Sequence, residues 1–266
     1  MIGQERILNK LKSFTLQTLP HTILFVGKRG CGKHTIVKEL ASNFGIDVVD
    51  ISEDINNDFL VEIYMRSLQV FYLIDIDKIT ERNQNTLLKI LEEPPTSAYM
   101  VLISSSKKLL LDTVLNRCMI YEFEDYTKEQ LKEFVREDVY GDKALEVCTT
   151  PGQLLTLNYK TLDDIEESIN KLLEKLNVVL LPSLLNLVDR VNFGDEYDKY
   201  DLDVFLTVLE KRIYRLILEQ NKTINYFKIY NILCKYKTLF EDSRLKKNLL
   251  FENMLIEMWQ ESRKEK

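Results

Sequence analysis

Two patterns of apolar and polar positions alternate along the first 125 residues. Short apolar runs, which are typical of buried strands, are separated by segments whose apolar residues recur with helical spacing. The strand-like runs are 22–27, 47–52, 70–77 and 100–105, helices are predicted at 35–45 and 84–93, and a further apolar segment covers 59–68. Strands that alternate with helices predict a parallel sheet covered by helices, so the fold class of this part is α/β.

After about residue 125 helical periodicity dominates to the end of the chain. Residues 126–137 begin with Thr127 as the predicted N-cap and Gln130 at the capping-box position. Residues 149–153 predict a turn that starts a helix, and 191–201 a charged connector. Two long amphipathic helices follow, at 203–220 and 243–259. The second half is therefore expected to be all-helical.

Composition excludes several classes of protein. Lys and Arg total 36 against 42 Asp and Glu, so tight DNA binding by the chain alone is not expected. The four cysteines lie far apart and there are only two histidines, which predicts no zinc or other metal site. The longest apolar stretch, 178–188, is too short to span a bilayer and contains Pro182. No secretory signal is visible at the start of the sequence, so we expect a cytoplasmic protein without membrane contact.

Residues 27–35, GKRGCGKHT, come directly after the first predicted strand and before the first of the helices in that region. Gly27, Gly30 and Gly32 permit the backbone to approach a phosphate without a Cβ in the way. Lys33 supplies a positive charge for the β- and γ-phosphates of a nucleotide. A strand, a glycine-rich loop and a helix in this order predict a phosphate-binding loop.

The loop departs from the usual pattern at its last position. His34 stands where a Ser or Thr hydroxyl normally ligates Mg²⁺, and imidazole is a poor ligand for that ion. Thr35 can replace the hydroxyl only through a shift of one residue, and a helix turns by roughly 100° per residue. The alternative for His34 is an exposed residue at the start of a helix with no ligand role.

The strand-like run 70–77 is the second candidate for nucleotide chemistry. An ATPase needs a carboxylate at the end of a buried strand to hold the water shell of Mg²⁺, and commonly a Glu beside it. The run ends in Asp75, Ile76 and Asp77, which contains no Asp-Glu pair. Alternation along a strand predicts Asp75 and Asp77 on the same side. Asp75 is the catalytic candidate, and Asp77 also suits a helix or turn cap.

Several longer segments resemble the AAA+ subunits of DNA-polymerase clamp loaders. Residues 80–95, TERNQNTLLKILEEPP, are followed by MVLISSSKKLLLDTVLNRC at 100–118, with Asn116, Arg117 and Cys118 as a variant of the Ser-Arg-Cys motif of that family. IGQERILNKLK (2–12) is similar to its adenine-side box, and LPHTILFVGKRGCGK (19–33) to its phosphate-loop region. SRLKKNLLFENMLIEMW (243–259) resembles its last collar helix. The resemblance therefore extends to both ends of the chain.

The resemblance implies an AAA+ P-loop module at 1–125, a helical lid at 126–178 and an all-helical collar that mediates oligomerisation at 179–266. It implies that Arg117 is an arginine finger, which neutralises charge at the nucleotide of a neighbouring subunit. An Arg that covers a sheet edge or pairs with an acid is the alternative. Cys118 is expected to be a packing residue rather than a nucleophile. The implied partners are other AAA+ subunits through the collar, the sliding clamp, and primed DNA through the complex.

Aligned on LLKILEEPP, the chain departs from the hydrolysing members of that family. Ile74 falls where they have the metal-binding Asp, Asp75 where they have Glu, and Gln153 near their sensor Arg. With His34, these departures affect one chemical site, and resemble the delta-prime type, which keeps the finger while its own site is degraded. ATP with Mg²⁺ is therefore a doubtful cofactor.

Some of the family's features are absent or ambiguous. Residues 36–70 contain none of the zinc cysteines that many bacterial members carry there. Residues 104–106, all Ser, lie at the polar sensor position, where a loop role is equally compatible. The candidates for DNA contact are Arg66, Arg82, Lys107 and Lys108, although scattered basic residues commonly mark a solvated face. Two other functions stay open: a hydrolysing clamp-loader subunit that uses Lys33, Thr35 and Asp75, and a solitary AAA+ switch protein.

Overall fold

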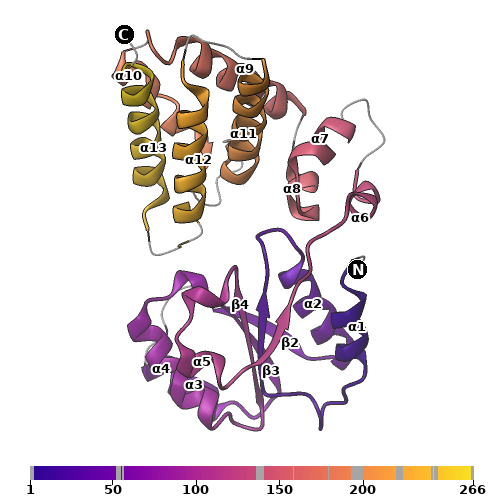
Figure 1. Cartoon of the computed structure of the whole chain (residues 1–266). Coiled ribbons are helices and arrows are strands. Elements are labelled where there is room, and N and C mark those ends of the chain that lie inside the picture. Colours follow the sequence, from indigo (N-terminus) through magenta and orange to yellow (C-terminus); the bar gives the residue numbers. More distant parts are fainter. Residues whose placement is uncertain are drawn as a thin grey trace. The chain divides into compact units, whose positions relative to one another are not determined.

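The computed structural model describes residues 3–51, 55, 57–135, 141–157, 159–178, 180–192, 200–219, 224–240, 242 and 245–264. The chain folds into two compact units. The first contains residues 1–134 together with 150–152, and the second contains 135–149 and 153–266. Figure 1 shows a sheet in the first unit and long helices in the second.

The first unit is built on a five-stranded sheet in the order β2-β3-β4-β1-β5 (Figure 1). Its strands, all parallel, are β1 (Thr22–Val26), β2 (Asp47–Ile51), β3 (Val70–Asp75), β4 (Ala98–Ser104) and β5 (Met119–Glu122). The central strands β1 and β4 are buried along their whole length, which explains their uninterrupted apolar sequences. The predicted parallel sheet is confirmed.

Helices cover both faces of this sheet (Figure 1). Because side chains alternate along a strand, Phe25 and Leu24 of β1 enter different cores. The core around Phe25 is closed by α1 (Glu5–Lys12) and α2 (Lys33–Phe44). The core around Leu24 is closed by three helices: α3 (Asn57–Met65), α4 (Glu81–Glu92) and α5 (Asp112–Leu115). The segment 59–68 is thus helical over its first part.

The predicted strand 70–77 is too long. β3 ends at Asp75, and Ile76–Lys78 forms a 3-10 turn, η1. Ile76 is buried in the core, and the Asp77 carboxylate accepts hydrogen bonds from Ser104 and Ser105 at the end of β4. These tertiary contacts end the strand, so the prediction that Asp75 and Asp77 lie on one strand face was wrong.

The chain leaves the sheet through α6 (Lys128–Lys132), which still belongs to the first unit. The predicted capping box is confirmed: the Thr127 hydroxyl accepts from the Gln130 backbone N–H, and the Gln130 side chain accepts from the Thr127 N–H. Two short 3-10 turns, η2 (Lys107–Leu109) and η3 (Val188–Arg190), lie elsewhere in the chain.

The second unit is mainly helical. Its helices are α7 (Gly141–Val147), most of α8 (Pro151–Thr156), α9 (Tyr159–Lys175), α10 (Leu181–Leu185), α11 (Leu202–Leu218), α12 (Tyr226–Phe240) and α13 (Lys247–Ser262). One hydrophobic core contains Ile165 and Ile169 of α9 together with Phe205, Leu233 and Phe251. This core therefore includes residues from both sides of position 178, and the division into lid and collar stays a prediction.

The predicted connector 191–201 is bounded by a short parallel pair, β6 (Val191–Asn192) and β7 (Tyr200–Asp201), and its middle lies outside the described residues. In the described ranges, no helix is both long and apolar enough to cross a bilayer.

Candidate functional site

The glycine-rich loop leaves the end of β1 and enters α2. A Cβ on Gly27 would lie 2.7 Å from Cβ of Phe123, so the close packing of the loop requires glycine there. Gly30 and Gly32 have φ angles of 78° and 101°, in the left-handed region that glycine adopts without strain. The three glycines therefore also shape the loop, in addition to any approach of a phosphate.

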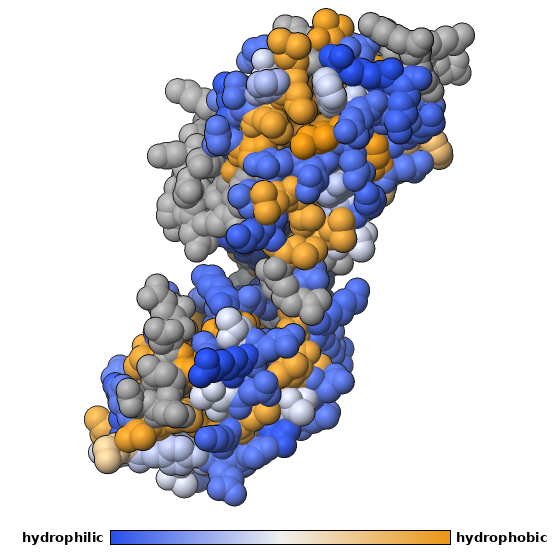
Figure 2. Space-filling model, turned by 90° about the vertical axis from the view of Figure 1, so that its left-hand side faces the viewer, coloured by the Kyte–Doolittle hydropathy of each residue, from blue (hydrophilic) through white to orange (hydrophobic). Residues whose placement is uncertain are grey.

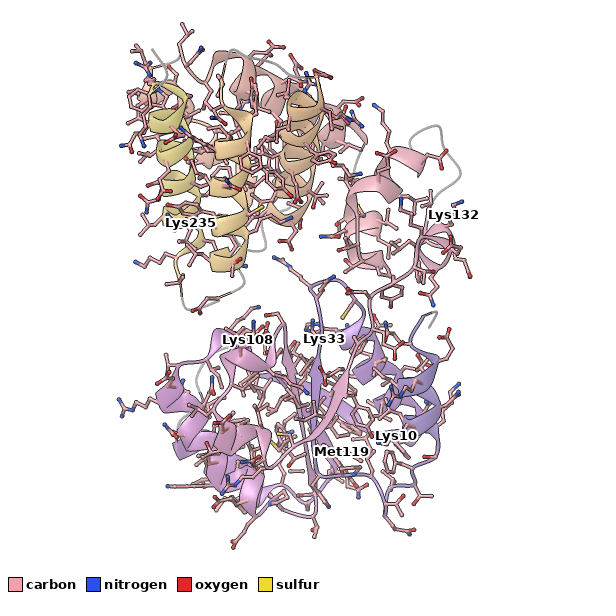
Figure 3. The ribbon with its side chains drawn as sticks, in the orientation of Figure 1. Lys10, Lys33, Lys108, Met119, Lys132 and Lys235 are labelled. Atoms are coloured by element: carbon pink, nitrogen blue, oxygen red, sulfur yellow. The ribbon has the colours of Figure 1, made fainter. Side chains whose placement is uncertain are left out.

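Lys33 folds back over this loop. Its Nζ donates hydrogen bonds to the carbonyl oxygens of Gly27 and Lys28, the latter at 2.9 Å. Burial lowers the pKa of Lys33, and the carboxylates of Asp77 and Asp75 act against that shift. Figure 3 shows Lys33 at the end of the sheet where the loop leaves β1. The structure thus brings Lys33 close to the two acids that follow β3.

Two further groups hold the loop from outside. The Gly152 N–H donates to the Gly30 carbonyl at 2.9 Å, and the Tyr126 hydroxyl donates to the Cys31 carbonyl at 2.9 Å. A Cβ on Gly152 would lie 2.5 Å from Cα of Gly30, which is far inside contact distance. The start of α8 therefore lies directly against the phosphate loop, and the loop holds its shape through contacts within the chain.

We expect Gly152→Ala to lower the free energy of unfolding by about 1–3 kcal/mol, because overpacking against the Gly30 backbone outweighs the helix propensity of Ala. Chemical denaturation measures the change, and hydrogen exchange at the loop amides localises it. Gly45→Ala is the matched control, since its Cβ would meet nothing within 4 Å and only the positive φ of 65° is strained. A stabilised Gly152→Ala protein would contradict the contact.

His34 and Thr35 lie in the first turn of α2, and both are exposed. Loss of water around the imidazole lowers the pKa of His34, whereas the charges of Asp50 and Asp75 act in the opposite direction. Asp50 on β2 is an acid near this position that the sequence did not single out. A neutral, exposed imidazole offers Mg²⁺ a nitrogen where this ion prefers oxygen.

The position aligned with the metal-binding carboxylate lies inside the protein. Ile74 is completely buried and packs in the core around Leu24. The next residue, Asp75, is half-buried, which raises its pKa, and its Oδ2 lies 3.5 Å from Nζ of Lys78. Asp75 is therefore the acid at the end of this strand, and the ammonium of Lys78 in the following turn partly neutralises its charge.

Asp77 and the serines after β4 form a separate hydrogen-bonded cluster. The Ser104 hydroxyl donates to Oδ1 of Asp77 at 2.5 Å, and the Ser105 backbone N–H donates to Oδ2 at 2.6 Å. Ser106 caps η2 by accepting from the Lys108 N–H. Both oxygens of Asp77 thus already accept bonds, and the predicted capping role agrees with this geometry. Together with Ile74 and His34, this donor set is poor in the free oxygen ligands that Mg²⁺ requires.

Gln153 also has a local role. Its Oε1 accepts a hydrogen bond from the Thr149 backbone N–H at 2.9 Å and lies 3.4 Å from the Thr149 hydroxyl. The side chain therefore supports the turn before α8. A neutral amide in this position supplies no positive charge for a γ-phosphate.

Arg117 is held at the surface just after α5. Its backbone N–H donates to the Val114 carbonyl, its Nη1 donates to the Thr113 carbonyl at 2.7 Å, and its Nη2 forms an ion pair with Glu92. Cys118 packs against the core, and burial raises the pKa of its thiol to about 12, so it stays protonated. The guanidinium is thus fixed on a rigid base with a third of the side chain exposed.

Two of the four candidates for DNA contact are engaged within the chain. Arg66 pairs with Glu62 at 2.9 Å, and Lys107 pairs with Glu122. Arg82 and Lys108 are exposed, and Figure 3 shows Lys108 at the same end of the first unit as Lys33.

The sequence did not reveal Glu92, Asp50 or Gly152. Of these three residues, only Glu92 could have been found from the sequence. A carboxylate in the last turn of a helix is unfavourable, so a cation close to it is expected.

Comparisons with known proteins bear on the family that the chain resembles. A family model described as "DNA polymerase III, delta subunit" matches residues 42–127. The DNA polymerase III subunit gamma of Buchnera aphidicola from Acyrthosiphon pisum is 24% identical over 259 residues, covering 84% of this chain and 70% of the relative. The subunit delta' of Buchnera aphidicola from Baizongia pistaciae is 38% identical over 69 residues, covering 26% of this chain and 20% of the relative. The resemblance to AAA+ clamp-loader subunits is confirmed.

A solved structure supports the fold. A variant of the Thermotoga maritima protein RuvB superposes with a TM-score of 0.51 at 17% identity, covering 94% of this chain and 85% of that one. At this identity the likeness concerns the fold alone. The predicted fold class, an AAA+ P-loop module followed by helices, is confirmed.

Proposed function

We propose that this chain is a clamp-loader subunit of the delta-prime type, which activates a neighbouring ATPase subunit without hydrolysing ATP itself. The observation that carries the proposal is the contrast between two regions of the first unit. Arg117 is one-third exposed and is held by bonds to α5 and α4. Around its own phosphate loop, the acid that follows Ile74 is paired with Lys78, and Asp77 is engaged by serines.

The loop itself retains groups that suit a phosphate: glycine backbone, the N-terminus of α2 and the ammonium of Lys33. Lys33 has three donors, and two are directed to loop carbonyls, so binding of a phosphate competes with or shares these bonds. Hydrolysis needs more than phosphate binding, because Mg²⁺ and an attacking water must also be positioned. We therefore assign nucleotide binding without turnover to this loop.

The second unit carries the surface through which the chain assembles with its partners in this proposal. Exposed apolar side chains occur on three of its long helices: Tyr214 and Leu218 of α11, Phe227 of α12 and Leu249 of α13. Figure 2 shows clusters of apolar side chains on the helical unit. Exposed apolar clusters commonly mark interaction sites. The partners are AAA+ ATPase subunits, and the sliding clamp and primed DNA are reached through the complex in the cytoplasm.

Titration of the purified chain with a fluorescent ATP analogue, with and without Mg²⁺, tests the assignment of its own site. We expect no Mg²⁺-dependent gain in affinity and no release of phosphate, because oxygen ligands for the ion are scarce. Co-expression with the clamp-loader ATPase subunits of the same source should give a defined hetero-oligomer. Magnesium-dependent turnover by the isolated chain would favour a hydrolysing subunit. Failure to form a complex with the ATPase subunits would favour a solitary switch protein.

A further inference from the structure

The side chain of Arg117 is bonded to two different elements of its own chain. Nη1 reaches the Thr113 carbonyl on α5, and Nη2 reaches Oε1 of Glu92, the last residue of α4. The two residues of the ion pair are 25 positions apart in the sequence. Such a pair depends on the packing of α4 against α5, which the shared core of Leu91 and Val114 fixes.

Glu92 occupies an unfavourable position for a carboxylate. The C-terminus of a helix carries a partial negative charge, and acids there destabilise it. α4 nevertheless ends in two acids, Glu92 and the C-cap residue Glu93. Of these two acids Glu92 pairs with Arg117, whereas the backbone carbonyl of Glu93 accepts a hydrogen bond from the Tyr64 hydroxyl. The cation at Arg117 compensates the first acid, and the field of the helix end adds to its attraction.

The geometry leaves part of the guanidinium free for another anion. Arginine has five N–H donors, of which two are directed to Thr113 and Glu92. The side chain remains 33% exposed. Both bonds use only part of the donor set, so they can persist while another anion binds, and the side-chain entropy of arginine is already lost before a neighbour arrives.

We propose that Glu92 is a positioning residue, which holds Arg117 in the orientation that engages the phosphates of a neighbouring subunit. This inference rests on the proposed function of Arg117 in trans. Glu92 touches neither nucleotide nor metal and acts through the guanidinium alone. The opposite effect, partial neutralisation of the finger by the carboxylate, is weaker because both groups are partly exposed and screened.

The test uses the assembled complex with co-purified ATPase subunits, primed DNA and ATP. Glu92→Ala should lower the maximal rate of DNA-stimulated hydrolysis at the neighbouring site by about three- to tenfold, with assembly unchanged. Glu92→Gln keeps an acceptor but loses the charge, so its rate should lie between that of the unchanged complex and that of Glu92→Ala. Glu93→Ala is the matched control, since it removes an adjacent acid from the same helix end, and it should leave the rate unchanged.

A double-mutant comparison separates positioning from a structural role. If Glu92 acts through Arg117, Glu92→Ala has no further effect when Arg117→Ala is already present. An equal loss in both backgrounds, a loss matched by Glu93→Ala, or a faster rate in Glu92→Ala would each overturn the inference. If Arg117→Ala alone leaves the rate unchanged, the proposed function has failed, and the positioning role fails with it.

Discussion

Replacement of Arg117 by Ala should lower ATP turnover at the neighbouring subunit by about a thousandfold or more, while the chain still assembles. In the proposed function the guanidinium neutralises charge that develops on the transferred phosphoryl group, and the truncation removes that charge. The truncation removes a partly exposed side chain whose polar contacts are an ion pair and one bond to a backbone carbonyl, so the fold should be little affected. Single-turnover phosphate release from the assembled complex, resolved by site where possible, measures the loss.

Two variants make the result specific. Arg117→Lys keeps the charge but loses the planar fork, and should restore only part of the rate. Arg6→Ala removes an exposed arginine from α1, with 89% of its side chain in solvent, and should change nothing. An Arg117→Ala complex with normal DNA-stimulated turnover would refute the finger. Loss of assembly in the same variant would instead assign Arg117 to the contact between subunits.

The sequence predicted those features that depend on neighbours along the chain. The apolar runs of β1 and β4 mark strands buried on both faces, and Thr127 with Gln130 forms a capping box as the spacing requires. The sequence singled out the loop glycines for the approach of a phosphate, which stays a prediction; in the structure, packing at Gly27 and positive φ angles at Gly30 and Gly32 favour glycine. In each case the signal lies within a few residues of sequence, although the contact that requires glycine at position 27, with Phe123, is tertiary.

The features that the sequence missed depend on contacts between distant segments. The run 70–77 has the composition of one strand, but the Ser104 hydroxyl and the Ser105 N–H bind Asp77 and hold it in a turn. The packing of Gly152 on Gly30 depends on how the chain returns to the loop after α6 and α7. Neither partner can be chosen from periodicity or capping rules, because many serines and glycines fit them equally well.

Ile74→Asp should lower the free energy of unfolding by on the order of 4 kcal/mol, without creating Mg²⁺-dependent nucleotide binding. The substitution restores the carboxylate that hydrolysing relatives of the clamp-loader type are expected to have. Ile74, however, is fully buried between the sheet and its helices, and packs with apolar residues. A carboxylate there would lie in this apolar core, so we expect the cost of burying its charge to exceed any gain from a metal. Urea denaturation measures the loss, and the nucleotide titration described above tests the metal.

The pH dependence of the same variant identifies the cause. Burial raises the folded-state pKa of the new carboxyl above its unfolded value of about 3.9, so the added penalty is small below that pH and grows as the pH rises. Ile74→Asn introduces polarity without a titrating charge, and Ile74→Val should cost only about 0.5–1.5 kcal/mol. We therefore expect the stability difference between the Asp and Asn variants to widen from pH 4.5 to 7.5. A difference independent of pH would show that the carboxylate reaches solvent at the end of β3, and a gain in Mg²⁺-dependent binding would show that this position can still serve a metal site.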